Sequence, residues 1–177
     1  MEGITFKIVP FYTGIFAFYY VLLSLRIISI RRKYHIALGD GLLEFIAFVD
    51  QERTKSLPDV DSSTKMAHPF SNVNIDYTKF RQLQRAVRAH ANFSEFIPLG
   101  LLSIFFIEIN NYLSSTWIHI VCGALLVSRI CHAELAFNDK NNKLAVNNWR
   151  RIGMSLSFLV LIFSGIINGY NYFFYKY

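Results

Sequence analysis

A run of polar residues lies where the sequence otherwise predicts a membrane-spanning helix. The run contains Arg81, Arg85, Arg88, Asn92 and Glu95. At about 100° per residue, all of them fall within roughly 80° of the helix circumference. From Arg85 to Glu95 the stripe is about 15 Å long, roughly half the thickness of the hydrocarbon layer. A charged group at this depth costs about 2.5–3.5 kcal/mol, so the stripe indicates a polar site that opens from one side of the membrane.

The residue types in this stripe favour a small ligand that carries several charges. Guanidinium groups such as that of Arg88 bind carboxylates through paired hydrogen bonds, and the Glu95 carboxylate accepts hydrogen bonds from an ammonium group. The amide of Asn92 can pair with a peptide group. The alternative is that the arginines reach the lipid headgroups while Asn92 and Glu95 join neighbouring helices. A short carboxylate at this depth cannot easily reach the headgroups, so we favour the ligand site.

A second polar face follows in a later apolar segment. Arg129 and His132 lie within roughly 60° of each other on a helix, whereas Glu134 points away from them. Arg129 and His132 can therefore contact the first stripe inside a helix bundle. The alternative is an ion pair, such as Arg129 with Glu95, that holds two helices together. The two interpretations are compatible, because a buried pair can form part of a site.

The last apolar segment opens with Arg150 and Arg151. Two basic residues at this position usually anchor a helix at the membrane interface. The Arg151 guanidinium also lies at the same membrane level as the start of the polar stripe. At that level it can lower the pKa of a bound thiol and stabilise the thiolate.

The elements that must position these residues are membrane-spanning helices. The chain has 177 residues, of which 53% are hydrophobic and only 17% are charged. This composition, with apolar segments long enough to cross a bilayer, indicates one all-α integral membrane domain over residues 1–177. An insertion at about 42–79 is predicted to hold a short apolar helix at Leu42–Val49, either packed on the bundle or lying in the membrane interface. An exposed or partly disordered loop is predicted to follow at Gln51–Asn74. The predicted spans are about 4–30, 80–107, 115–137 and 149–174.

Basic residues are concentrated in two of the predicted connections. By the positive-inside rule, the first and third connections face the cytosol and both termini lie on the opposite side. The ligand is therefore expected to enter from the cytosol. Topology and contact with anionic membrane lipid explain the net charge of +6, which makes a nucleic-acid partner unnecessary. The basic residues of these connections are Arg31, Arg32, Lys33, Arg53, Lys55, Lys65, Lys79, Arg81, Lys140, Lys143, Arg150 and Arg151.

The cysteines and histidines do not indicate a disulfide or a metal site. Cys122 and Cys131 lie on one predicted helix, about 13 Å apart along its axis, which is too far for a disulfide. The histidines are dispersed, without the spacing of a metal site, so no metal is expected.

Four features in order resemble a known family. They are Ile30-Arg31-Arg32-Lys33, Leu38-Gly39-Asp40-Gly41, the run Arg85–Leu99 with its R-A-H-x-N-x-x-E-x-x-P string, and Arg129-Ile130-Cys131-His132-Ala133. Together with Arg151-Ile152-Gly153-Met154, they make the chain similar to the membrane-associated proteins in eicosanoid and glutathione metabolism (MAPEG), and closest to the bacterial-type branch. The resemblance covers nearly the whole chain apart from about residues 42–79.

This resemblance implies a bundle of four transmembrane helices that forms a homotrimer and binds glutathione as a co-substrate between protomers near the cytosolic face. The family's glutathione-binding residues on the second span fall on Arg88, Asn92 and Glu95. The arginine thought to stabilise the thiolate best matches Arg151. Other positions that the resemblance matches to ligand contacts are Arg31, His90 and His132.

The chain also departs from the family pattern. Phe96 and Ala136 stand where family members carry tyrosines, so two hydroxyl groups are lost from the expected site. The insertion at about 42–79 is longer than the usual connection, and it could cap the cytosolic mouth of the site. Glutathione binding is therefore expected, whereas an activity specific for eicosanoids is not.

Two functions of different classes follow. The first is a membrane glutathione transferase or peroxidase, in which the thiolate attacks a lipophilic electrophile or a lipid hydroperoxide, with Arg129 also in the binding set. The alternative is a non-catalytic scaffold or accessory subunit of a larger assembly, with a protein partner at 42–79. A transporter has little support, because no pair of broken helices is predicted. Endoplasmic reticulum, mitochondrial or other organelle membranes, and the bacterial inner membrane, all fit this multi-pass chain.

Overall fold

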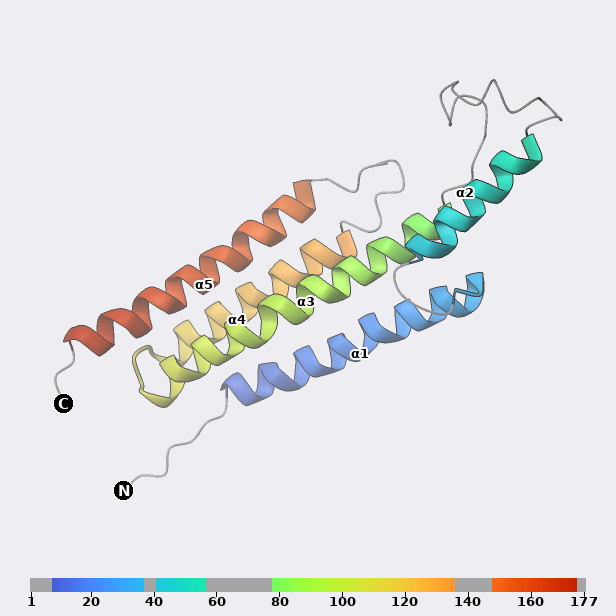
Figure 1. The fold of residues 1–177 in the computed structure, drawn as a ribbon. Coiled ribbons are helices and arrows are strands. Elements are labelled where there is room, and N and C mark those ends of the chain that lie inside the picture. The colour runs from blue at the N-terminus through green and yellow to red at the C-terminus, as the bar shows by residue number, and fades with distance from the viewer. Residues whose placement is uncertain (1–7, 37–40, 57–77, 136–147, 175–177) are drawn as a thin grey trace. The chain divides into compact units, whose positions relative to one another are not determined.

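A computed structural model describes residues 8–36, 41–56, 78–135 and 148–174, and all regular structure within these ranges is helical. Two compact units are present, one formed by the chain up to Leu25 and from Arg88 onward, the other by Arg26–Val87. The helices, shown in Figure 1, are α1 (Ile8–Tyr34), α2 (Leu42–Ser56), α3 (Thr78–Ile109), α4 (Ser115–Ile130), which continues as the π-helix η2 (Cys131–Leu135), and α5 (Asn148–Phe174).

Four helical segments are long and apolar enough to cross a membrane within the described part of the chain: α1, residues 80–109 of α3, α4 with η2, and α5. The all-α class with four candidate spans is therefore confirmed. The first span ends later than predicted, because α1 continues through Arg31, Arg32 and Lys33 to Tyr34. Basic side chains in the last turn of a helix interact favourably with its dipole, which explains the extension. The ends of the predicted spans at residues 4–7 and 136–137 lie outside the described residues.

The first unit has one apolar core shared by α1, α3 and α4, to which η2 adds Ala133 and α5 adds Val160. Phe16 of α1, Ile104 of α3 and Leu125 of α4 are almost completely buried within it. α3 approaches α4 closely at Gly100, where an added Cβ would lie 2.9 Å from a methyl group of Leu125. Other apolar side chains, such as that of Leu159 on α5, are exposed, as expected for side chains that face lipid.

Polar contacts fix the helices of the first unit at the end where α3 meets α4. The two carboxylate oxygens of Glu108 on α3 accept hydrogen bonds from the backbone amides of Ile8 and Val9, at 3.0 and 3.1 Å. These amides begin α1 and have no partner within their own helix, so the carboxylate serves as its cap. The Asn168 side-chain amide of α5 donates to the carbonyl oxygen of Ser103 on α3 at 2.9 Å.

The second unit has a smaller core of Ile36, Phe80 and Leu83, against which Phe45 and Phe48 of α2 pack. The turn before α2 places Gly41 at a φ of +82°, a conformation that residues with a side chain rarely adopt.

The short helix predicted at Leu42–Val49 is present, but α2 runs on to Ser56. The predicted start of a loop at Gln51 is therefore wrong for 51–56, and the rest of that loop, at 57–74, lies outside the described residues. The segment 51–56 follows the packed Phe45 and Phe48 without a helix-breaking residue. The prolines on which the loop prediction rested lie beyond Ser56.

Candidate functional site

The polar face of α3 is at the surface of this chain. Arg88 and Glu95 are exposed, and Asn92 between them is half-buried. The Asn92 amide donates to the carbonyl oxygen of Arg88 at 2.8 Å, which holds that side chain against its own helix. The three residues predicted to bind a charged ligand therefore share one accessible face within the first unit.

Behind this face lies a buried arginine whose hydrogen bonds join three helices. The Arg129 side chain on α4 is only 1% exposed. Its Nη1 donates to the carbonyl oxygen of Asn92 on α3 at 3.3 Å, and its Nη2 donates to the carbonyl oxygen of Gly153 on α5 at 3.4 Å. Nη2 also donates to the Ser157 hydroxyl, and Nε donates to the Ser128 hydroxyl at 3.2 Å.

Neutral oxygens and one aromatic ring surround this guanidinium group. The Phe96 ring lies 5.2 Å from it and packs on Phe158 of α5 with ring centroids 5.6 Å apart. Among the described residues, no carboxylate is within ion-pair distance of Arg129, and Glu95 is exposed instead. The ion pair of Arg129 with Glu95, left open as an alternative by the sequence, is therefore not formed within this chain.

α4 and α5 approach most closely at Gly153. A Cβ added there would lie 2.5 Å from the carbonyl oxygen of Ser128 and 2.8 Å from the backbone nitrogen of His132. Only glycine permits this distance between the two backbones. Arg151 lies two residues before Gly153 and is exposed. The close contact thus fixes the start of α5, where the predicted thiolate-stabilising residue lies.

His132 is buried in η2, the π-helical turn that ends the α4 segment. Its side chain is 5% exposed, and no partner within hydrogen-bond distance of Nε2 is found among the residues that the structure covers. Single π-helical turns are frequent at functional sites. Sequence periodicity did not predict this turn. Ala136, the position of a lost tyrosine, lies outside the described residues.

His90 is directed toward α1. Its Nε2 lies 3.0 Å from the Ser24 hydroxyl, and its ring lies 4.6 Å from that of Tyr20. At about 100° per residue, His90 also lies outside the polar face of α3 that carries Arg88, Asn92 and Glu95. Any contact of His90 with a ligand must therefore involve the side of α3 that faces α1.

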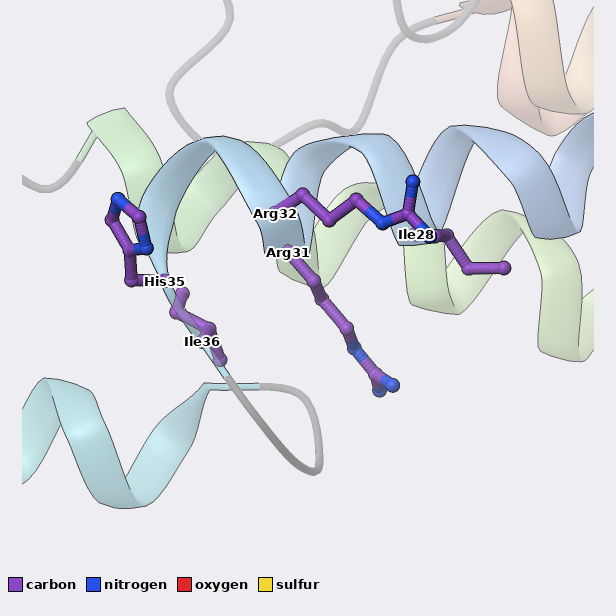
Figure 2. A pocket seen from close by; sticks show the side chains of 5 residues that line it. All are labelled: Ile28, Arg31, Arg32, His35 and Ile36. Atoms are coloured by element: carbon purple, nitrogen blue, oxygen red, sulfur yellow. The ribbon is translucent and has the colours of Figure 1, made fainter.

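Arg31 belongs to the second unit. It lines an open pocket of about 680 Å³ at the end of α1, together with Ile28, Arg32, His35 and Ile36. Figure 2 shows that Arg32 extends along the helix toward Ile28, whereas Arg31 points away from it. His35 has a φ of +55° and ends the helix, and the Ile36 amide donates to the carbonyl oxygen of Arg31 at 3.0 Å. Two guanidinium groups in one pocket favour an anionic group as ligand.

Sequence reasoning missed Gly153 and Ser157 as partners of Arg129. The available signal was the spacing of small residues on α5, where Gly153, Ser157 and Ser164 are all buried. Small residues at intervals of three or four let membrane helices approach closely. That pattern indicates that another helix packs against α5, but it does not show which side chain of that helix lies at the contact.

Comparison with known proteins agrees with these features. The model of the MAPEG family matches residues 9–170. The inner membrane protein YecN of Escherichia coli strain K12 is 33% identical over 90 residues, which are 50% of this chain and 63% of YecN. YecN of Escherichia coli O6:H1 gives the same values. The chain thus covers less than two thirds of these curated relatives. No solved structure matches the chain.

Proposed function

The chain belongs to the MAPEG family, and from this membership we propose that it is a membrane-bound, glutathione-dependent transferase or peroxidase. The observation that carries the proposal is the joint placement of two sets of charged groups. Arg88 and Glu95 are exposed on α3, and Arg151 is exposed at the start of α5, in one compact unit. Arg129 hydrogen-bonds α3 to α5 next to both sets.

In the proposed complex, charged groups of glutathione have partners of opposite charge on α3. Arg88 holds a carboxylate, Glu95 accepts from the ammonium group, and Asn92 pairs with a peptide group. Arg151 stabilises the thiolate. Arg31, His90 and His132 remain predicted contacts.

The reaction is a nucleophilic attack by the thiolate sulfur. With an electrophilic carbon, a C–S bond forms and the leaving group departs with its electron pair, or an activated double bond takes up the electrons and a proton. With a lipid hydroperoxide, sulfur attacks oxygen and the O–O bond breaks, giving an alcohol and a glutathione sulfenic acid. A second glutathione converts this acid to the disulfide and water. The protein contributes positioning and charge stabilisation.

A homotrimer would complete the site. Arg88 and Glu95 lie on a span and are exposed on the single chain, and charged groups at this depth are unfavourable against lipid. A second copy that covers this face would remove the exposure and enclose the ligand. The lipophilic substrate would then arrive laterally from the bilayer.

Glutathione binding to the detergent-purified protein, measured by calorimetry together with the ultraviolet absorbance of the bound thiolate, tests the proposal. Glu95→Gln should weaken binding by about tenfold or more, because it removes a charged hydrogen-bond acceptor. Arg151→Ala should abolish the thiolate absorbance, while the affinity for glutathione, measured at a pH below the wild-type midpoint of that absorbance where the thiol is bound, changes by less than about threefold. Arg150→Ala, which removes the neighbouring charge, is the matched control and should keep the absorbance.

Lack of binding by the wild type at millimolar glutathione would disprove this function. The non-catalytic scaffold would then be favoured, and the search would turn to protein partners of residues 42–79. Equal loss of absorbance in Arg150→Ala and Arg151→Ala would instead remove the specific role of Arg151.

A further inference from the structure

One guanidinium group links the two halves of the proposed site. Arg129 binds main-chain carbonyl oxygens of Asn92 on α3 and of Gly153 on α5. Asn92 is itself a proposed ligand contact, and Gly153 follows Arg151 by two residues. A sliding of α5 along α3 would stretch at least one of these hydrogen bonds. The separation of Arg151 from the ligand-binding face of α3 therefore depends on Arg129.

Ser157 completes the junction. Its hydroxyl accepts a hydrogen bond from Arg129 and lies 2.8 Å from the Ser128 hydroxyl and 2.9 Å from the carbonyl oxygen of Gly153. Ser128 and Ser157 have no exposed surface. Loss of the Ser157 hydroxyl would leave the guanidinium group one acceptor short, where water cannot replace that acceptor. Arg129 would then move toward its remaining partners.

Arg129 is too deeply buried to act as an ordinary surface contact for a ligand. Its 1% exposure contrasts with the exposed side chains of Arg88, Glu95 and Arg151, and the Phe96 ring packs against it. All its hydrogen-bond partners within the described helices are neutral oxygens on the protein. Such a residue acts on a ligand through the helices that it holds.

We propose that Arg129 and Ser157 are positioning residues that set the distance between Arg151 and a thiol bound along Asn92 and Glu95. This inference rests on the proposed function. Stabilisation of a thiolate by a guanidinium group decreases with their separation, so a small shift of α5 reduces it. Binding of the carboxylate and ammonium groups depends on α3 and is affected less. The expected signature is loss of thiolate with retained affinity.

Ser157→Ala tests this inference, with Ser164→Ala as the matched control. Ser164 is a fully buried serine on the same helix, and its hydroxyl has no hydrogen-bond partner among the described residues. The pH midpoint of the bound-thiolate absorbance should rise by about one unit in Ser157→Ala. The glutathione dissociation constant, measured at a pH below the wild-type midpoint where glutathione binds as the thiol, should change by less than about threefold. Ser164→Ala should keep both wild-type values.

Arg129→Lys provides a second variant. An ammonium group on a single chain cannot hold both carbonyl oxygens and the Ser157 hydroxyl in the same fork geometry. The pH midpoint of the bound-thiolate absorbance should therefore rise further in Arg129→Lys than in Ser157→Ala. An unchanged midpoint in Ser157→Ala, or the same shift in Ser164→Ala, overturns the inference, because either result means that the buried serines only pack.

A readout without glutathione separates this inference from the proposed function. Phe96 and Phe158 lie on α3 and α5 with ring centroids 5.6 Å apart. With both replaced by cysteine, a short bifunctional thiol reagent should cross-link the helices about three- to tenfold more slowly when Ser157→Ala is added. Adding Ser164→Ala should leave the rate unchanged.

Equal cross-linking rates with and without Ser157→Ala would contradict the proposed role of Ser157 in positioning α5, whether or not glutathione binds. Different rates without glutathione binding by the wild type confirm that Ser157 controls helix position, but disprove the proposed function and the catalytic role assigned to the junction.

Discussion

At the scale of single residues, Arg129 shows how a membrane protein accommodates a buried cation. Its N–H groups are directed to two serine hydroxyls and two main-chain carbonyl oxygens. Such hydrogen bonds offset the loss of hydration that makes intramembrane charge costly. The carbonyl oxygens belong to two different helices. The hydrogen bonds that compensate for burial of the charge therefore also hold these helices together.

Gly153 makes this arrangement possible, and its replacement should destabilise the protein. A Cβ at this position would lie 2.5 Å from the Ser128 carbonyl oxygen, so α4 and α5 must separate in Gly153→Ala. Overpacking of this kind costs about 1–3 kcal/mol. Unfolding in a detergent titration measures the loss. Gly165→Ala on the same helix meets no atom within 4 Å and is the control. Equal stability of the two variants would contradict the proposed close contact.

At the scale of elements, the four spans could be predicted from the sequence because their signal is local. Length and apolar composition identify a span, and the spacing of Arg88, Asn92 and Glu95 places them on one face of a helix whatever surrounds it. The structure keeps these residues on one accessible face of α3.

Features that depend on which helices pack together could not be predicted. The angular position of Arg129 indicated a polar face, but its partners Gly153 and Ser157 come from a helix whose rotation the sequence does not fix. The π-helical turn at Cys131–Leu135 alters the rotation of every following side chain, so a regular helical wheel misplaces them. The extension of α2 to Ser56 was likewise missed, because composition alone favoured a loop there.

The packing of α2 on α3 depends on Phe80. Its ring centroid lies 5.0 Å from that of Phe45 and 5.9 Å from that of Phe48, and the residue is 8% exposed. Phe80→Ala should therefore raise amide hydrogen exchange in α2 by about tenfold or more. Ile46→Ala, an exposed position on α2, is the control and should change exchange little. Unchanged exchange in Phe80→Ala would show that α2 does not depend on this contact.

At the scale of the whole molecule, charge placement predicts one orientation in the membrane. The last turn of α1 carries Arg31, Arg32 and Lys33, and α5 begins with Arg150 and Arg151. The turn between α3 and α4, residues 110–114, contains no basic residue. The positive-inside rule therefore places the end of α1 and the start of α5 in the cytosol.

Thiol labelling of intact cells with a membrane-impermeant reagent tests this orientation. Asn110→Cys in the α3–α4 turn should react without permeabilisation, because that turn is expected on the non-cytosolic side. Lys33→Cys should react only after permeabilisation. Both positions are exposed, and the native Cys122 and Cys131 are buried, so background labelling should be low. The reverse pattern would place the ligand entrance on the other side.

The carboxylate cap on α1 has a consequence for how the chain is made. The amide of Ile8 is bound by Glu108, which lies 100 residues later in the sequence. The ribosome therefore completes α1 well before the group that binds its N-terminal amides. Until α3 has been inserted, those amides must be satisfied by water or lipid headgroups, so α1 can still slide along the membrane normal. The arrival of Glu108 ends this freedom, so α1 is expected to reach its final depth only after α3 has been inserted.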